Sequence, residues 1–462
     1  MVQGVSSSSG KSLLTTALAR AARRRGVDVA PFKAQNMFNN ARVVAGGEIG
    51  TAQQALAAGV EPDVRMNPIL VKPEGDNRSQ VVVLGKPDLE LSQLPWRPRP
   101  ARLWPVIEQA LQSLLGEHEL LLLEGAGSPA EINLRESDLA NMRTAKAAGA
   151  RVILVADIDR GGAFAHLYGT WALRAEDERA LITGFVLNKF RGDFSLLPPA
   201  PVQLEELTGV PTLGVLPWLE HGLPDEDEAA TPLPLHDRQK VVVVRYPTAS
   251  NLDEFKQLEQ VAELRWAARP EEIEDADLVI LPGSKHVAAD LAWLERTGLA
   301  EAVRTRARCG RPVLGICGGL QMLGERIEDE AGVDGSANGL ALLSLRTAFA
   351  ASKQTEKTST QFSLLAEPWA ALGGKRLTGY QIRHGQTTTT APVAEALPDG
   401  LGFVEGAVLG IYVHGVFEQP ELLEALFGWS PHRSLDEAFD ELADAVEACL
   451  DVAALLDQVR AA

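Results

Sequence analysis

The sequence has few cysteines, no long apolar run and no excess of positive charge. Its 462 residues include only Cys309, Cys317 and Cys449, which are too few and too irregularly spaced for a disulfide framework or a zinc site, and this indicates a reduced, cytoplasmic protein. No apolar run is long enough to span a bilayer, and no basic leader precedes an apolar segment. The net charge of −18 argues against general nucleic-acid binding. We therefore expect small-molecule partners, no nucleic acid and no membrane span, with the oligomeric state left open.

The segment PVLGICGGLQMLG, residues 312–324, predicts a buried strand, a tight turn and a helix, with Cys317 at the turn. Unpaired N–H groups at a helix N-terminus lower the pKa of a thiol and can hold the oxyanion of a tetrahedral intermediate. A lone cysteine is usually a small core residue. The flanking Gly-Ile-Cys-Gly-Gly favours a nucleophile instead and resembles the nucleophile elbow of class I glutamine amidotransferases. Gly283 lies in LPGSK, where an expected strand ends, and Gly318 directly follows Cys317. We expect these two glycines to supply oxyanion-hole amides.

A cysteine nucleophile needs a base within hydrogen-bond reach. His414 lies just beyond an expected strand, in YVHGVFE, and has the best context of the eight histidines, with His286 and His384 as alternatives. Many class I amidotransferases carry His-x-Glu, in which the Glu orients the His. Val416 stands at the acidic position here. We therefore expect a dyad of Cys317 and His414.

A glycine-rich loop, GVSSSSGKS, follows the first apolar residues and precedes an amphipathic helical pattern at 13–24. The backbone amides of such a loop cradle phosphates, Lys11 reaches their charge, and the Ser12 hydroxyl can ligate Mg²⁺. The loop is one residue longer than the common pattern and resembles that of dethiobiotin synthetase. It predicts ATP and Mg²⁺ as cofactors, with ATP bound by Gly4, Ser9, Gly10, Lys11 and Ser12. The resemblance also implies that Asn188 contacts the nucleobase.

Two expected buried strands, ELLLLE and RVILVAD, end in the carboxylates Glu124 and Asp157. Single acidic strand ends are usually helix caps or surface loops. Several of them in one sheet with a phosphate loop, counting Asp138 on the segment after Glu124, indicate a nucleotide–metal site. We expect Ser12, Glu124 and Asp157 to be the metal ligands. The candidates for charge at the phosphates or the substrate are Lys33, Asp138, Arg160 and Lys189.

Apolar strands alternate with helical patterns of ten or more residues throughout, which is typical of an α/β fold with mostly parallel sheets. We expect a P-loop NTPase-like domain at 1–224, an acidic, proline-rich linker at 225–239, a class I glutamine amidotransferase-like α/β domain at 240–430 and a helical tail at 431–462. Within the second domain, strands are expected at 339–346, 377–382 and 408–413. An exposed polar stretch at 352–361 and a threonine-rich loop at 387–390 separate them.

Motifs along nearly the whole chain resemble those of the cobyric acid synthase family. They include VQGVSSSSGKS, PFKAQNM, EGAGSPAEINL, ADIDRGGAFA, NKFRGD, LPGSKH, GICGGLQMLG and YVHGVFE. The resemblance implies ATP- and glutamine-dependent amidation of the b, d, e and g carboxylates of adenosylcobyrinic acid a,c-diamide, giving adenosylcobyric acid in cobalamin biosynthesis. Ammonia released at Cys317 would react with an acyl phosphate in the P-loop domain. The chain departs from the pattern at Ser8, where an acidic residue is usual, and at Gln381 and Arg383, where Glu and His are usual.

Three other functions fit parts of the sequence. Cobyrinic acid a,c-diamide synthase shares both domain types, but PFKAQNM and AEINL favour cobyric acid synthase. A regulatory P-loop ATPase fused to a non-catalytic amidotransferase-like module is disfavoured by intact Cys317 and His414. An amidase for a cell-wall precursor is disfavoured by the single two-domain chain.

Overall fold

The computed structural model describes residues 1–37, 41–75, 78–219, 223, 238–431 and 433–460. The chain forms two compact units, Met1–Glu228 with Arg433–Ala462, and Ala229–His432. Both contain parallel sheets with helices, which confirms the predicted fold class. Most of the linker predicted at 225–239 lies outside the described residues. In the described part of the chain, no helix is both long enough and apolar enough to cross a membrane.

The first unit is built on parallel strands whose carboxyl ends meet at one edge. A four-stranded parallel sheet has the order β1 (Val2–Gly4), β10 (Val152–Asp157), β11 (Ile182–Phe190) and β12 (Thr212–Pro217). A parallel pair, β2 (Val29–Phe32) and β9 (Leu120–Leu123), is joined to β1 by a bridge between Val2 and Glu124. Because parallel strands share one carboxyl edge, the phosphate loop after β1, Glu124 after β9 and Asp157 of β10 come to the same side of the fold.

Eight helices are described within residues 1–219. They are α1 (Lys11–Arg24), α2 (Ala52–Ala58), α3 (Leu89–Gln93), α4 (Arg99–Glu117), α5 (Met142–Ala147), α6 (Ala163–Ala172), α7 (Glu176–Arg179) and α8 (Ala200–Thr208). The α1 helix begins directly after the phosphate loop, and its apolar face is buried in the core with β1 and β2. The 3-10 helix η2 (Ile132–Ser137) lies between β9 and α5.

A second small sheet in this unit was missed by the sequence analysis. Its strands, in spatial order, are β3 (Gln35–Met37), β6 (Ile69–Gly75), β7 (Arg78–Val83) and β8 (Lys86–Asp88), and a hairpin of β4 (Arg42–Val44) and β5 (Gly47–Ile49) accompanies them. The polar segment at 33–37, within the PFKAQNM motif, contains β3. Short strands with mixed polar and apolar residues carry little periodicity, so the pattern gave no strand signal.

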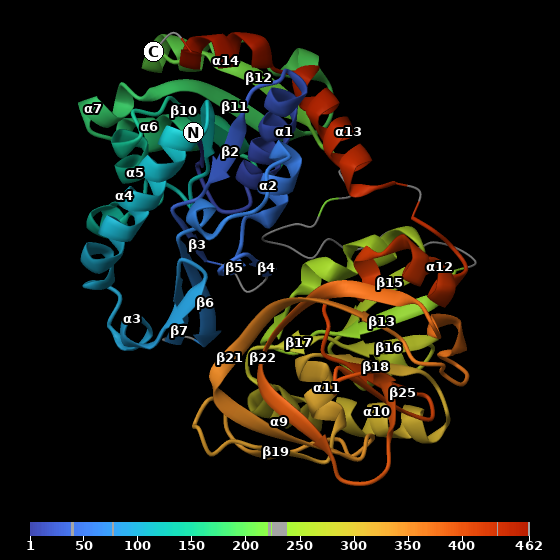
Figure 1. Ribbon diagram of the computed structural model, residues 1–462. Helices are drawn as coiled ribbons and strands as arrows, with labels where there is room; N and C mark the ends of the chain where they lie inside the picture. The colour runs from blue at the N-terminus through green and yellow to red at the C-terminus, as the bar shows by residue number, and fades with distance from the viewer. Residues whose placement is uncertain (38–40, 76–77, 220–222, 224–237, 432, 461–462) are drawn as a thin grey trace. The chain divides into compact units, whose positions relative to one another are not determined.

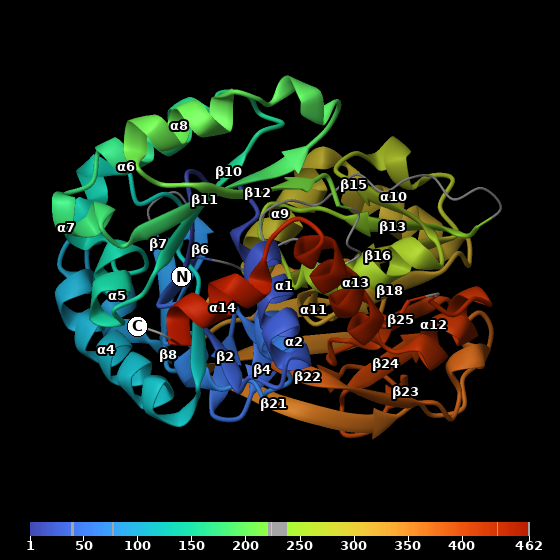
Figure 2. The ribbon, with the colours of Figure 1, turned by 90° about the horizontal axis from the view of Figure 1, so that it is seen from above.

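The C-terminal tail belongs to the first unit and packs against α1. The pattern at 436–459 predicted one helical tail, but the structure has two helices, α13 (Leu435–Glu447) and α14 (Val452–Arg460). Figures 1 and 2 both show α13 beside α1. The Ser434 hydroxyl caps α13 by accepting from the backbone N–H of Glu437 at 3.2 Å.

The second unit has a seven-stranded sheet between two apolar layers. Its order is β15 (Glu263–Ala267), β13 (Lys240–Val244), β16 (Leu278–Leu281), β18 (Val313–Ile316), β25 (Val408–Ile411), β24 (Gly402–Glu405) and β23 (Ala394–Leu397), with the first five strands parallel. Alternate side chains of β13 enter opposite clusters, Val241 and Val243 on one face and Val242 and Val244 on the other. The helices are α9 (Val287–Thr297), α10 (Leu299–Arg308), α11 (Gly318–Leu323) and α12 (Pro420–Phe427). The sheet positions the residues that follow β16, β18 and β25 at one edge.

A long antiparallel hairpin corrects three sequence expectations. It consists of β21 (Leu345–Gln361) and β22 (Arg376–Thr389), and β19 (Arg326–Glu328) and β20 (Ala337–Asn338) extend its sheet (Figure 1). The strand expected at 339–346 starts only at Leu345, and the threonine-rich loop at 387–390 largely belongs to β22. The polar stretch at 352–361 is a strand, although its side chains are exposed or half-buried. Both faces of much of the hairpin are polar, so it lacks the alternation that marks a half-buried strand.

Candidate functional site

Cys317 occupies a sharp turn between β18 and α11. Its backbone φ and ψ are 53° and −105°, a conformation that residues other than glycine rarely adopt. Its backbone N–H donates to the Ile411 carbonyl at 2.7 Å, which fixes the turn against β25. The thiol is buried and lies 3.4 Å from the Ile382 carbonyl of β22. The predicted strand, turn and helix are confirmed.

The structure brings His414 to Cys317, and its role as the base stays a prediction. Burial raises the pKa of the Cys317 thiol, but the hydrogen bond and charge of His414, with the charges of Arg383 and Lys285, bring it below its ordinary value. Burial lowers the pKa of His414, but the charge of Glu254 and the hydrogen bond with Cys317 outweigh it and raise that pKa to about 10. The two groups therefore favour a thiolate beside an imidazolium.

The predicted dyad is wrong, because a carboxylate also contacts His414. Glu254, in the 3-10 helix η4 (Leu252–Gln260), has one oxygen 2.9 Å from His414 Nδ1 and accepts from the Gly415 backbone N–H at 2.9 Å with the other. The exposed fractions of Glu254 and His414 are 0% and 2%. Glu254 precedes His414 by 160 residues, so no local motif points to it, and it supplies the carboxylate that Val416 cannot.

The competing histidines have other partners. His286 Nδ1 lies 2.9 Å from Asp334, and His384 Nδ1 lies 3.1 Å from the Ala350 carbonyl. His414 is instead held between Glu254 and the ring of Tyr380, which stacks on the imidazole at 5.2 Å and 17°. This arrangement favours His414 as the proton carrier for Cys317.

The two predicted oxyanion-hole glycines lie at the same centre. A Cβ on Gly283 would stand 3.2 Å from His414 Cε1, and a Cβ on Gly318 would stand 2.7 Å from the Ser284 backbone nitrogen. Gly283 and Ser284 form the short strand β17, paired with β14 (Ala249–Ser250). A side chain at Gly318 would clash with Ser284, and one at Gly283 would be tightly packed. The role of the two amides stays a prediction.

The phosphate loop of the first unit has the backbone form that its glycines predict. Gly4 ends β1, and Gly10 precedes α1 with φ 97°, a left-handed conformation that favours glycine. A Cβ on Gly10 would overlap the Asn188 side chain. Asn188 donates to the Ser9 carbonyl at 3.0 Å, and Lys11 donates to the Ser6 carbonyl at 3.0 Å. Asn188 therefore braces the loop, and its predicted contact with a nucleobase stays a prediction.

Glu124 collects three hydrogen bonds beside this loop. One oxygen accepts from the Ser12 hydroxyl and the Lys33 ammonium, each at 2.7 Å, and the other accepts from Gln54 at 3.2 Å. A hydroxyl and a carboxylate are ligands that suit Mg²⁺, which usually takes one or two protein oxygens together with phosphates and water. Ser12 and Glu124 therefore fit a Mg²⁺–ATP site. The described residues contain no group of three or more His, Cys, Asp or Glu side chains arranged to hold a metal ion.

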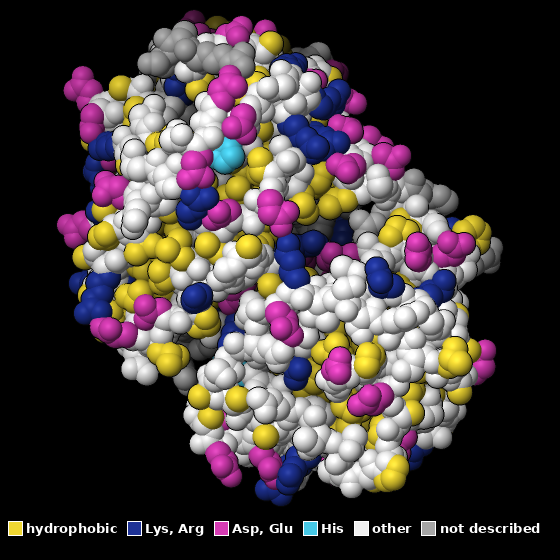
Figure 3. All heavy atoms as spheres, viewed as in Figure 1, with side chains coloured by type: hydrophobic (Ala, Val, Ile, Leu, Met, Phe, Trp, Pro, Cys, Tyr) yellow, Lys and Arg dark blue, Asp and Glu magenta, His cyan; other side chains and the backbone are white. Residues whose placement is uncertain are grey.

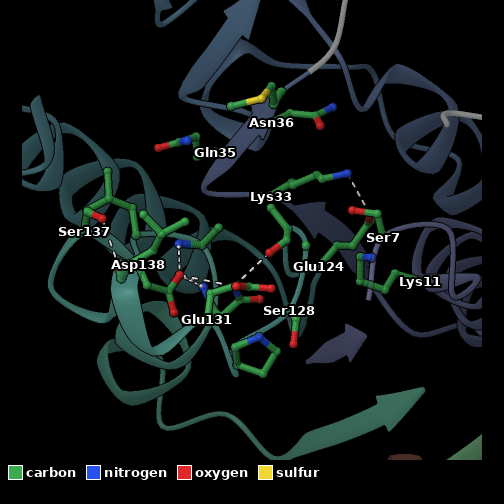
Figure 4. Close-up of a pocket in the computed structure, with 18 of the residues that line it drawn as sticks. Ser7, Lys11, Lys33, Gln35, Asn36, Glu124, Ser128, Glu131, Ser137 and Asp138 are labelled. Atoms are coloured by element: carbon green, nitrogen blue, oxygen red, sulfur yellow. Dashed lines mark hydrogen bonds and ion pairs between the residues drawn. The ribbon is translucent and has the colours of Figure 1, made fainter. Parts of the chain in front are cut away.

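Ser12, Lys33 and Glu124 line a pocket of about 330 Å³ (Figure 4). Lys11, Lys33 and Glu124 lie close together in it, and Asp138 reaches it from the segment before α5. The Asp138 carboxylate accepts from the backbone N–H groups of Ala140 and Asn141 at 3.1 and 3.0 Å, and burial raises its pKa. These contacts hold the turn that precedes α5, so the predicted role of Asp138 in ligand binding has a structural alternative.

Three other predicted residues, Asp157, Arg160 and Lys189, lie together. They are not among the described residues that line this pocket. Asp157 lies 3.1 Å from Lys189 Nζ and 3.4 Å from Arg160 Nε. Lys189 also donates to the Ser8 carbonyl of the phosphate loop at 3.0 Å. The structure therefore brings Ser12 and Glu124 into hydrogen-bond contact, whereas Asp157 pairs with two cations, and the predicted metal-ligand role of all three stays a prediction.

The positive charge at the phosphate loop is local. On the face shown in Figure 3, acidic and basic side chains are interspersed rather than separated into one large basic patch. Lys11 and Lys33, in contrast, are buried at the pocket. A pair of buried ammonium groups at a phosphate loop suits an anionic ligand in a protein of net charge −18.

Comparison with known proteins covers both units. A family model described as a CobQ/CobB/MinD/ParA nucleotide binding domain matches residues 1–228, and one described as a CobB/CobQ-like glutamine amidotransferase domain matches residues 240–422. The cobyric acid synthase of a Polaromonas species is 52% identical over 97% of this chain and 95% of its own. That of Variovorax paradoxus is 53% identical over 97% and 96%. A solved structure of PurLQS from Thermotoga maritima matches 45% of this chain and 97% of its own, with 18% identity and a TM-score of 0.31.

Proposed function

Because the chain belongs to the cobyric acid synthase family, we propose that it amidates the b, d, e and g carboxylates of adenosylcobyrinic acid a,c-diamide, using glutamine and ATP. The product is adenosylcobyric acid, an intermediate of cobalamin biosynthesis, and the enzyme is a glutamine-hydrolysing carbon–nitrogen ligase. The observation that carries the proposal is one chain with both a Cys317–His414–Glu254 site and a phosphate loop beside Glu124. We also propose a cytoplasmic location, because all three cysteines are free thiols.

The second unit releases ammonia from glutamine. The Cys317 thiolate attacks the side-chain amide, and amides of Gly283 and Gly318 hold the oxyanion. His414 gives its proton to the departing ammonia and then takes one from the water that hydrolyses the thioester. Glu254 holds the imidazole in place and stabilises its positive charge.

The first unit uses that ammonia. Carboxylates are poor electrophiles, and ATP supplies the phosphoryl group that turns one into an acyl phosphate. Ammonia then attacks the acyl carbon and displaces phosphate, which leaves the amide. Ser12 and Glu124 are the proposed Mg²⁺ ligands, and Lys11 and Lys33 offset charge on the phosphates and the substrate. Asp157 remains a further candidate ligand. Ammonia passes between the two sites inside the protein, because it is protonated in neutral water and then is no nucleophile.

The test is mass spectrometry of the corrinoid after reaction with ATP, Mg²⁺ and glutamine labelled with nitrogen-15 on its side-chain amide. We expect four labels in the product. Cys317→Ser should abolish labelling from glutamine but retain amidation from added ammonia, because the nucleophile is needed only to release ammonia. Cys309→Ser, at an exposed free thiol of the same unit, is the matched control and should behave as the unmodified protein.

Two results would contradict the proposal. ATP hydrolysis without any label in this corrinoid would remove the substrate assignment. Loss of both glutamine- and ammonia-driven amidation in a folded Cys317→Ser protein would argue against separate sites for the two reactions.

A further inference from the structure

Three large apolar side chains line the pocket that contains the phosphate loop, and each is well exposed. Met37 ends β3, Trp96 lies between α3 and α4, and Leu134 belongs to η2. Their exposed fractions are 52%, 37% and 44%. Single exposed apolar residues are common on proteins. Three that come from separate segments and line one pocket indicate a binding surface for an apolar part of a ligand.

The Trp96 ring is supported from within the protein. The guanidinium of Arg99 lies 5.7 Å from the centre of the Trp96 ring. Arg99 is itself buried, and it donates to the carbonyls of Leu94 and Ser92 at 3.0 Å each and to the Ser79 hydroxyl at 2.7 Å. A fixed cation behind an exposed ring positions that ring before any ligand binds, which lowers the entropy cost of binding.

The phosphate-loop side of the pocket carries charged and hydroxyl side chains, and the pocket is small compared with the substrate of the proposed function. Lys11, Ser12, Lys33 and Glu124 line it, and the pocket volume is about 330 Å³. That volume suits phosphate groups and one side-chain carboxylate. A corrin macrocycle with an axial adenosyl group is too large to enter with them. When one carboxylate reaches the phosphate loop, the macrocycle must therefore lie against the residues around the pocket.

On the basis of the proposed function, we propose that Met37, Trp96 and Leu134 form an apolar rim that binds the corrin macrocycle while one of its carboxylates reaches Lys33 and the phosphate loop. The four carboxylates stand at different places around the ring, so the substrate must bind in four orientations. Directional hydrogen bonds to ring substituents fit one orientation. Apolar contact with the ring and its methyl groups is non-directional and serves all four.

The test measures corrinoid binding without ATP or glutamine. Adenosylcobyrinic acid a,c-diamide is equilibrated with the full-length protein, and the free corrinoid is measured by its visible absorbance after ultrafiltration. Trp96→Ala should weaken binding about tenfold, the loss expected for one aromatic contact, and Trp96→Phe should retain most of it. Leu207→Ala is the matched control. Leu207 lies on α8, is 63% exposed and is not among the described residues that line the pocket. Binding by this variant should equal that of the unmodified protein.

A second measurement separates the apolar rim from a contact with one particular side chain. With nitrogen-15 glutamine and limiting corrinoid, Trp96→Ala should slow all four amidations by a similar factor and leave glutamine hydrolysis, which takes place in the other unit, unchanged. Selective loss of one amidation would overturn the rim, because it would indicate a directional contact. Unchanged corrinoid binding in Trp96→Ala would also overturn it.

The two proposals fail in different ways. If the unmodified protein binds the corrinoid and loses affinity in Trp96→Ala but never amidates it, the proposed reaction fails and the apolar rim is supported. If the protein amidates the corrinoid and Trp96→Ala binds it normally, the reaction is supported and the rim fails. An unmodified protein that neither binds nor amidates the corrinoid contradicts both.

Discussion

The imidazole of His414 lies between a thiol and a carboxylate, and the balance of their charges sets its proton affinity. Burial alone lowers the His414 pKa, whereas Glu254 and Cys317 raise it to about 10. The imidazolium therefore persists at neutral pH and is lost as the pH rises through that raised value. Glu254→Gln should lower the His414 pKa, move the alkaline limb of glutamine hydrolysis to lower pH and reduce kcat/KM by roughly a hundredfold or more. The pH profile of glutamine hydrolysis measures both effects.

Asp334→Asn provides the matched control for this substitution. Asp334 contacts His286 Nδ1 at 2.9 Å and a backbone N–H, that of Ala288, at 3.2 Å, which repeats the contacts of Glu254 elsewhere in the same unit. Its pH profile should match that of the unmodified protein. Ammonia-driven amidation should survive in Glu254→Gln, because the acyl phosphate forms in the other unit. An unshifted alkaline limb in a folded Glu254→Gln protein would show that Glu254 does not set the charge of His414.

At the scale of elements, β22 holds His414 through a close approach of two backbones. Tyr380 and His414 exchange backbone hydrogen bonds of 3.3 and 2.9 Å, and a Cβ on the preceding Gly379 would overlap the His414 carbonyl oxygen. Since backbone cannot yield as a flexible side chain does, Gly379→Ala should displace β22 from His414. We expect glutamine hydrolysis to fall at least tenfold, measured at saturating glutamine, while ammonia-driven amidation continues.

Thr378→Ala is the control for β22, because it removes atoms from an exposed neighbouring residue of the same strand. It should retain most of the activity. A Gly379→Ala protein with normal glutamine hydrolysis would show that the contact between β22 and the His414 segment can shift without cost to the site.

Elements with strong periodicity were predictable from the sequence, and those formed by long-range pairing were not. The apolar strands leading to Cys317 and Glu124 appear as predicted, because a buried parallel strand is a continuous apolar run. The hairpin of β21 and β22 was missed, since its polar side chains lack alternation. At the site, Cys317 and His414 were found from local motifs, but Glu254 was not, because only the folded chain brings it to His414.

At the scale of the whole molecule, the chain leaves the first unit, forms the second and returns to complete the first. Phe439 and Leu442 of α13 belong to the same apolar cluster as Leu14 and Leu18 of α1. Arg20 of α1 adds ion pairs to Asp436 at 2.9 Å and Asp440 at 2.7 Å. The helix that begins at the phosphate loop is thus packed against the last segment of the chain.

The stability of the nucleotide-binding unit should therefore depend on the C-terminal tail. Phe439→Ala removes a fully buried ring from the cluster shared with α1 and should destabilise the first unit by about 3–5 kcal/mol. Val459→Ala, at an exposed position of α14, should change stability by less than about 0.5 kcal/mol.

Calorimetry with and without Mg²⁺–ATP identifies the transition of the first unit, since a bound ligand stabilises the unit that holds it. Phe439→Ala should lower that transition and leave glutamine hydrolysis unchanged, because Cys317 and His414 lie in the other unit. A fall in the other transition instead would show that the tail stabilises the amidotransferase unit.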